Sequence, residues 1–187
     1  MLFVDLMQFQ KKEIFKYGED IFYLFFGSFF LALMSQCSFY LWFTPIPISM
    51  QSFGVLLIGY LFGSKRGSLV IMTYLTEGAF GLPVFAGGGS GIATLMGLKG
   101  GYYLGFILSA FLVGYLIEKK SQESYRKLFI VFLLGTFVIL TFGATWLGCF
   151  IGMGQAFPLG VAPFLIGDFL KASVALLVVR GMKRLPE

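Results

Sequence analysis

Two ionisable residues three positions apart interrupt an apolar stretch near the end of the chain. Asp168 and Lys171 lie within residues 161–179, and on a helix this spacing places both side chains on one face. Ionisable groups inside a membrane span are costly, and they usually face a protein interior or a watery cavity, where they pair or bind a ligand. The pair is therefore the first candidate for a binding site. The alternative is a salt bridge that only neutralises itself.

The composition accounts for the apolar background of this pair. Hydrophobic residues make up 58% and charged residues 12% of the 187-residue chain, and the mean hydropathy is +0.87. A soluble domain carries about 25% charged residues. The sequence therefore predicts an all-α integral membrane protein of one domain, with no room for a large soluble catalytic domain.

The elements that must position the pair are candidate membrane helices, at residues 21–41, 53–62, 69–82, 102–117, 128–150 and 161–179. A helix needs ~20 residues to cross the ~30 Å hydrocarbon core. The second and third stretches are short and closely spaced, so five spans are the main alternative to six. We expect a cytoplasmic tail or interfacial helix in residues 1–20, a six-helix transmembrane domain with structured outer loops in 21–180, and a basic cytoplasmic tail in 181–187.

Basic residues support an even number of crossings, because short cytoplasmic loops collect Lys and Arg. With both termini inside, the cytoplasmic segments contain 12 of the 14 basic residues: Lys11, Lys12, Lys16, Lys65, Arg66, Lys119, Lys120, Arg126, Lys127, Arg180, Lys183 and Arg184. The net charge of +5 therefore indicates membrane topology and contact with anionic lipid, and not nucleic-acid binding.

Two outer connections are unusually apolar. Residues 44–49 contain two prolines, which favour a stiff extended segment. Residues 81–91 are rich in glycine, which lets the backbone approach another surface closely. Irregular backbone at membrane depth is tolerated only where protein covers it or where it lines a cavity. We therefore expect these loops to form a lid over an outward-facing pocket, with Asp168 about 10 Å below the outer end of its span.

Four ordered motifs carry a resemblance to a known family. They are PIPISMQ at residues 45–51, EGAFGLPVFAGG at 77–88, GGYYLGF at 100–106 and PFLIGDFLKA at 163–172. Together they resemble the BioY family, the biotin-specific substrate-binding (S) components of energy-coupling factor transporters. The resemblance implies a six-helix protein of the bacterial cytoplasmic membrane that captures biotin from outside. It also implies a transmembrane coupling subunit and two ATPase subunits as partners, although some members work without a dedicated set.

The resemblance implies that Asp168 and Lys171 contact the ligand. A carboxylate accepts hydrogen bonds from a ureido ring, and an ammonium donates to a ureido oxygen or to a carboxylate. Further candidates for substrate binding lie in the loop and at the mouth of the pocket: Ser90, Tyr102, Gln51, Glu77, Phe85 and Gly88. Lys99 stands where the family more often has an uncharged residue. It either attracts the carboxylate of a ligand or is a solvated loop residue, and the second interpretation is the more common one.

A small-residue face on the first helix is a candidate contact for a coupling subunit. Ser28 and Ala32 are four residues apart, with Gly27 beside them, and such spacing permits close approach of another helix. Packing against a neighbouring span of the same chain is an equal alternative.

Missing residue types narrow the function further. The chain has no P-loop and no histidine. Within the predicted spans, Glu77 is the only acidic residue besides Asp168. ATP binding through a P-loop and imidazole-based catalysis are therefore excluded. We predict a transporter subunit with no enzymatic activity, no cofactor and no metal. A stand-alone carrier for biotin or another small organic acid is the alternative.

Overall fold

The computed structural model describes residues 20–119 and 124–182. Residues 1–19 of the predicted N-terminal tail and most of the predicted C-terminal tail lie outside these residues, whereas the last helix extends to Met182. The secondary structure of the described residues is almost entirely helical, with one pair of two-residue strands.

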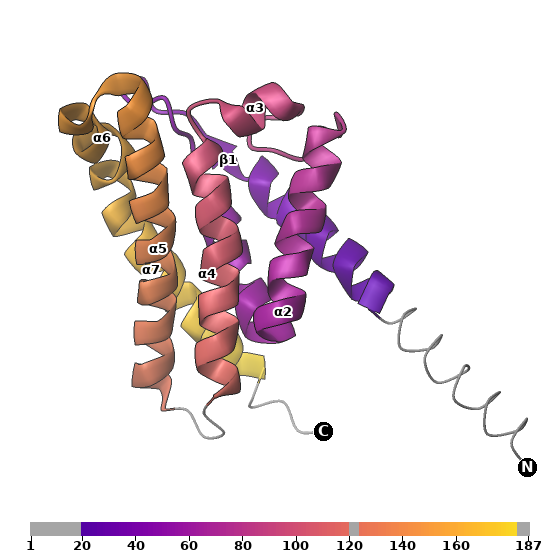
Figure 1. Ribbon diagram of the computed structural model, residues 1–187. Helices are drawn as coiled ribbons and strands as arrows, with labels where there is room; N and C mark the ends of the chain where they lie inside the picture. Colours follow the sequence, from indigo (N-terminus) through magenta and orange to yellow (C-terminus); the bar gives the residue numbers. More distant parts are fainter. Residues whose placement is uncertain (1–19, 120–123, 183–187) are drawn as a thin grey trace, which may run out of the picture.

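Long helices lie side by side and the short elements gather at one end of the molecule (Figure 1). The described part of the first helix is Asp20–Gln36. It is followed by β1 (Ser38–Phe39), β2 (Ile48–Ser49), α2 (Gln51–Ala79), α3 (Ile92–Met96), α4 (Gly100–Glu118), α5 (Tyr125–Ile151), α6 (Met153–Gly160) and α7 (Ala162–Met182). Four of these, α2, α4, α5 and α7, are long and apolar enough to cross a membrane, and the first helix is shorter. The prediction of a multi-pass, all-α membrane protein is confirmed.

The helix count differs from the expected six. The described residues form seven helices, because α3 and α6 occupy connections in which we expected no helix. The predicted second and third helices are two halves of α2, separated by Gly63 at φ 76° and ψ −174°. Glycine has no Cβ to clash at positive φ, which permits the chain to reverse there. A hydrogen bond of 2.6 Å from Gln51 Nε2 to the Tyr74 hydroxyl joins the two halves and shows that they run antiparallel.

Helix α4 lies between α2 and α5 (Figure 1), and glycines allow the close packing. A Cβ on Gly105 would lie 2.8 Å from Ile139 Cα of α5, and one on Gly59 of α2 would lie 2.8 Å from the Ala110 carbonyl oxygen of α4. Small residues at such contacts let helix backbones approach closely in a membrane protein. The packing fixes the face of α4 that carries Tyr102, Tyr103 and Phe106.

The two outer connections fold back onto the protein as expected, but they are held by different contacts. The first is not a simple extended segment, because β1 and β2 pair antiparallel with Ser38 opposite Ser49. The second, residues 81–91, is held by the end of the first helix. Gln36 Nε2 donates to the Phe85 carbonyl oxygen at 3.3 Å, and the Ser35 hydroxyl donates to the Val84 carbonyl oxygen. These side chains satisfy backbone carbonyls that no regular secondary structure pairs.

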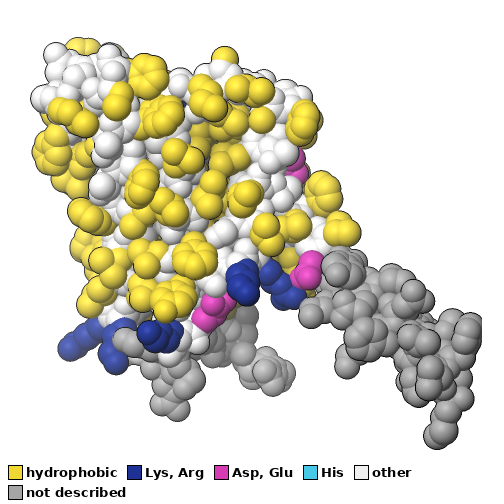
Figure 2. Space-filling model, viewed as in Figure 1, with side chains coloured by type: hydrophobic (Ala, Val, Ile, Leu, Met, Phe, Trp, Pro, Cys, Tyr) yellow, Lys and Arg dark blue, Asp and Glu magenta, His cyan; other side chains and the backbone are white. Residues whose placement is uncertain are grey.

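Basic side chains gather at one end of the described molecule, below a broad hydrophobic surface (Figure 2). They come from the reversal in α2, from the end of α4 and the start of α5, and from the end of α7: Lys65, Arg66, Lys119, Arg126, Lys127 and Arg180. Among the described residues, Lys99 and Lys171 are the basic residues that lie elsewhere. This separation is the pattern on which the predicted topology depended.

Candidate ligand-binding site

A cavity of about 470 Å³, measured to include its opening, lies among the starts of α2, α4 and α7. Apolar side chains form most of the wall: Ile46, Pro47, Phe106, Ile139, Leu140 and Phe164. The walls therefore suit a ligand with a substantial apolar body.

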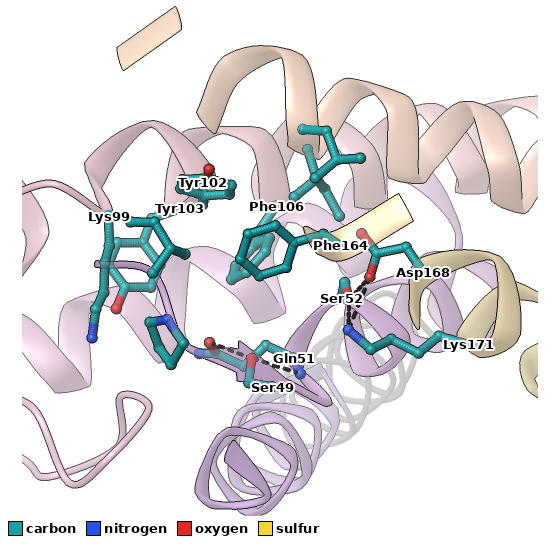
Figure 3. Close-up of a pocket in the computed structure, with 14 residues that line it drawn as sticks. Ser49, Gln51, Ser52, Lys99, Tyr102, Tyr103, Phe106, Phe164, Asp168 and Lys171 are labelled. Carbon is teal, nitrogen blue, oxygen red and sulfur yellow. Dashed lines mark hydrogen bonds and ion pairs between the residues drawn. The ribbon is translucent and has the colours of Figure 1, made fainter. Parts of the chain in front are cut away.

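Three polar side chains meet at one end of the cavity, which we call the Asp168 end (Figure 3). Lys171 Nζ lies 2.9 Å from Asp168 Oδ1 and donates to Ser52 Oγ at 3.1 Å. Ser52 Oγ in turn donates to Asp168 Oδ1 at 3.1 Å. Asp168 is 4% and Lys171 8% exposed. A buried ion pair is stable only when further hydrogen bonds satisfy its remaining polar atoms, and Ser52 supplies some of them.

The Asp168 end retains unused hydrogen-bonding capacity. The described residues provide hydrogen bonds to Asp168 Oδ1, and none of those bonds reaches Oδ2. An ammonium has three donors, and Lys171 uses two of them on Asp168 and Ser52. The pair lines a cavity, and both side chains can still form a hydrogen bond with a ligand there. This arrangement favours a ligand site over a salt bridge that only neutralises itself.

Gln51 and Tyr102 also line the cavity, as predicted, but their polar atoms already have partners. The Tyr102 hydroxyl donates to the Gly160 carbonyl oxygen at 2.7 Å. The Gln51 amide donates to the Tyr74 hydroxyl and accepts a hydrogen bond of 3.1 Å from the Ser49 hydroxyl. Both residues therefore shape the wall more than they offer free donors.

The opposite end of the cavity, which we call the Lys99 end, carries Lys99 and Tyr103 (Figure 3). Lys99 Nζ donates to the Tyr40 hydroxyl at 3.1 Å and lies 5.3 Å from the centre of the Tyr40 ring. Lys99 is half-exposed and lines the cavity, and its role toward the carboxylate of a ligand stays a prediction. Phe106 and Phe164 lie between the two ends.

Comparison with known proteins shows the family of this chain. The model of the BioY family matches residues 9–187. This chain belongs to the BioY family. A BioY protein of Thermotoga maritima, named as a biotin transporter, is 39% identical over 142 residues, which cover 75% of this chain and 83% of the relative. A BioY protein of Pyrococcus horikoshii, named as a probable biotin transporter, is 37% identical over 139 residues, covering 74% and 82%.

A solved structure agrees with the sequence relatives of this BioY chain. The crystal structure of the S-component for biotin from an ECF-type ABC transporter has a TM-score of 0.82 and 26% sequence identity. The match covers 91% of this chain and 94% of that one. The relatives are transporters, which confirms the prediction of a transporter and not an enzyme.

Four predicted site residues of this BioY chain lie away from the cavity. Phe85 is fully buried and packs against Tyr103, with ring centres 4.9 Å apart, so it supports the wall from behind. Gly88 is exposed and Ser90 half-buried in the loop that packs on the first helix. Polar side chains of the first helix hold this glycine-rich loop, and its role as a lid stays a prediction. Ile46 and Pro47 of the proline-containing connection line the cavity.

Glu77 contacts the first helix and not the cavity. Its two carboxylate oxygens lie 2.8 and 2.7 Å from Ser28 Oγ. In the described part of the chain no basic side chain pairs with Glu77. The predicted pocket contact is corrected to a link between the first helix and α2.

The small-residue face of the first helix points into the protein. Ser28 is 1% exposed, and a Cβ on Gly27 would lie 2.7 Å from a methyl group of Val70 in α2. Ala32 is half-buried and packs against the core. Gly27 and Ser28 thus contact their own chain, which corrects our expectation of a face open to a coupling subunit and matches the internal-packing alternative.

Sequence reasoning missed Ser52 and Tyr103. Ser52 carries no signal of its own, because a lone serine near a helix start is common. Tyr103 does have a signal: Lys99, Tyr103 and Phe106 follow the spacing of one helical face, and Lys99 was already unusual. Among the described residues, no three His, Cys, Asp or Glu side chains come together as a metal site.

Proposed function

We propose that this BioY chain captures biotin outside the cell and acts as the substrate-binding subunit of an energy-coupling factor transporter. The observation that carries the proposal is the buried cluster of Ser52, Asp168 and Lys171 at one end of an apolar cavity. A ureido ring presents N–H donors to the free oxygen of Asp168 and a carbonyl oxygen to the free donor of Lys171. The relatives named as biotin transporters support the same ligand.

The rest of the ligand would follow the apolar wall. The sulfur-containing ring and the alkyl chain of biotin pack against Phe106 and Phe164, which lie beside the Asp168 end. Burial of such a body in a preformed apolar cavity, oriented by a few polar groups, is how small-ligand sites usually obtain specificity. The side chains of Gln51 and Tyr102 then hold the wall in place.

We also propose six membrane crossings with both termini in the cytoplasm. Each half of α2 makes one crossing, since the halves run antiparallel around Gly63. The basic side chains at one end of the molecule support this orientation through the preference of Lys and Arg for the cytoplasmic side. The residues that line the cavity lie near the opposite end, at the starts of α2, α4 and α7.

Partners supply the energy for release inside the cell. The sequence has no nucleotide-binding motif of the P-loop type, so separate ATPase subunits bind ATP. A transmembrane coupling subunit connects them to this chain. The structural relative, an S-component of an ECF-type ABC transporter, supports this assembly.

Equilibrium binding tests the ligand. Labelled biotin added to the purified, detergent-solubilised protein should bind saturably at one site per chain, and an excess of unlabelled biotin should displace it. An equal excess of riboflavin or thiamin should not. Absence of saturable binding, or equal displacement by unrelated vitamins, would overturn the proposed ligand.

Cysteine labelling tests the topology. Single cysteines at Ser90 and Ser124, in a background with Cys37→Ser and Cys149→Ser, should react with an impermeant thiol reagent from opposite sides of the membrane. Labelling of both from the same side would contradict the six-crossing arrangement and the outward opening of the cavity.

A further inference from the structure

Tyr103 has the one buried hydroxyl at the cavity wall that lacks a hydrogen-bond partner among the described residues. The side chain is 3% exposed, lines the cavity, and its oxygen has no partner in this part of the chain. The neighbouring tyrosines differ: the Tyr102 hydroxyl donates to Gly160, and the Tyr74 hydroxyl donates to the Val84 carbonyl oxygen at 2.9 Å. A buried hydroxyl without a partner is costly. It therefore indicates that something else completes this end of the site.

The aromatic surroundings fix the direction of that hydroxyl. The Tyr103 ring lies between Phe85, with centres 4.9 Å apart, and Phe106, with centres 5.8 Å apart. The hydroxyl points to the same side as the Lys99 amine, away from Asp168 (Figure 3). Lys99 is the N-cap residue of α4, with helical backbone angles, and Tyr103 follows four residues later, so both donors lie on one side of the helix start.

The charges determine what kind of group these donors receive. At the Asp168 end the lysine charge is offset by an aspartate 2.9 Å away. Lys99 has no acidic partner among the described residues, and its amine contacts the neutral hydroxyl and the ring of Tyr40. An ammonium bound to one hydroxyl still has two donors. A free cation next to a free hydroxyl donor suits an anionic acceptor, and a carboxylate meets both requirements.

We propose that Tyr103 is a specificity-determining residue, whose hydroxyl donates to the carboxylate of the ligand together with Lys99. This inference rests on the proposed function, because biotin carries its carboxylate at the end of the chain opposite the ureido ring. The ligand then lies with its ring at the Asp168 end and its acid at the Lys99 end. The negative charge of Asp168 opposes the reverse orientation. The site distinguishes the free acid from esterified or amidated forms.

The test measures the affinities of Tyr103→Phe and of a control variant for biotin and for biotin methyl ester. Tyr103→Phe keeps the ring and removes the hydroxyl, and biotin methyl ester keeps the ring system and chain of biotin but has no charge. Tyr103→Phe should weaken the binding of biotin by about tenfold or more, because hydrogen bonds to charged groups contribute more than neutral ones. The affinity for the ester should fall by only about threefold or less. Tyr115→Phe, on an exposed part of the same helix, is the matched control and should leave both affinities unchanged.

Lys99→Met completes the comparison. The wild-type protein should prefer biotin over its ester, and this variant should lose most of that preference. Equal losses for acid and ester in Tyr103→Phe would mean that the residue only supports the wall, and would overturn the proposal. If the wild-type protein binds biotin but shows no preference for the acid, the inference fails while the proposed function stands. If the wild-type protein binds neither ligand, both fail.

Discussion

Asp168 and Glu77 are carboxylates of two different membrane helices, and their surroundings differ. Asp168 is 4% exposed, pairs with Lys171, accepts a hydrogen bond from Ser52 and lines the cavity. Glu77 also meets a serine hydroxyl from another helix, but it is half-buried, lies away from the cavity, and has no cationic partner in the described residues. The cavity and the cation together separate a candidate binding group from a link between helices. A charge in a span is by itself insufficient evidence of a binding site.

The largest expected effect follows from removal of the cation beside Asp168. Lys171→Met leaves a buried carboxylate without its counter-charge, which should destabilise the protein by about 3–5 kcal/mol. Thermal unfolding of the purified variant in detergent measures this loss. Addition of Asp168→Asn in the same chain should restore most of the stability but not biotin binding. If the single variant is as stable as the wild type, the ion pair contributes nothing to folding.

Asp168→Asn alone should keep the fold and weaken biotin binding. The amide offers one acceptor oxygen and no charge, so the loss should be about 1–3 kcal/mol, the range for a hydrogen bond that involves a charged group. Titration of the purified variant with labelled biotin measures it. Unchanged affinity would remove Asp168 from the site and make the two carboxylates equivalent.

Ser28→Ala should affect stability and leave binding alone. The substitution removes the hydroxyl that contacts Glu77, and it should destabilise the protein by about 1 kcal/mol, since solvent or lipid headgroups partly satisfy the half-buried carboxylate. Unfolding and biotin titration on the same preparation separate the two effects. A large fall in affinity with little change in stability would show that Glu77 acts on the site after all.

The smallest effect is expected for Glu77→Gln. The amide oxygen still accepts a hydrogen bond from Ser28, so stability should change by less than about 1 kcal/mol. Affinity for biotin should equal that of the wild type. Comparison with Asp168→Asn is the sharpest single contrast, because both substitutions replace a carboxylate by its amide. Equal effects of the two substitutions on biotin binding would contradict the assignment of Asp168 to the binding site and of Glu77 to a contact between helices.

The long helices and the Asp168 and Lys171 pair were predictable from the sequence, because both depend on local patterns. Apolar runs located α4, α5 and α7 to within a few residues, and the spacing of the pair placed it on one helical face. The reversal at Gly63 was partly predictable: two short stretches with a glycine between them indicated a break, although not that the halves would pack together as one assigned helix.

The placement of the loops was not predictable from composition. The glycine-rich connection looked like a lid, and its composition did not show that Ser35 and Gln36 would hold its carbonyl groups against the first helix. The small-residue face at Gly27 and Ser28 looked open to a partner, but α2 covers it. In both cases the same residues suit two different neighbours, and only the arrangement of helices decides between them.

The sequence by itself determined a multi-pass helical membrane protein, the family and the two charges most suited to bind a ligand. These follow from hydropathy, ordered motifs and helical spacing, which are properties of short segments. Only the tertiary structure decided that Ser52 completes the Asp168 cluster from a helix 116 residues away in the chain, and that Tyr103 keeps a free hydroxyl at the cavity wall. Hydrogen-bond satisfaction and burial depend on which segments meet in space, and that information is not contained in any one segment.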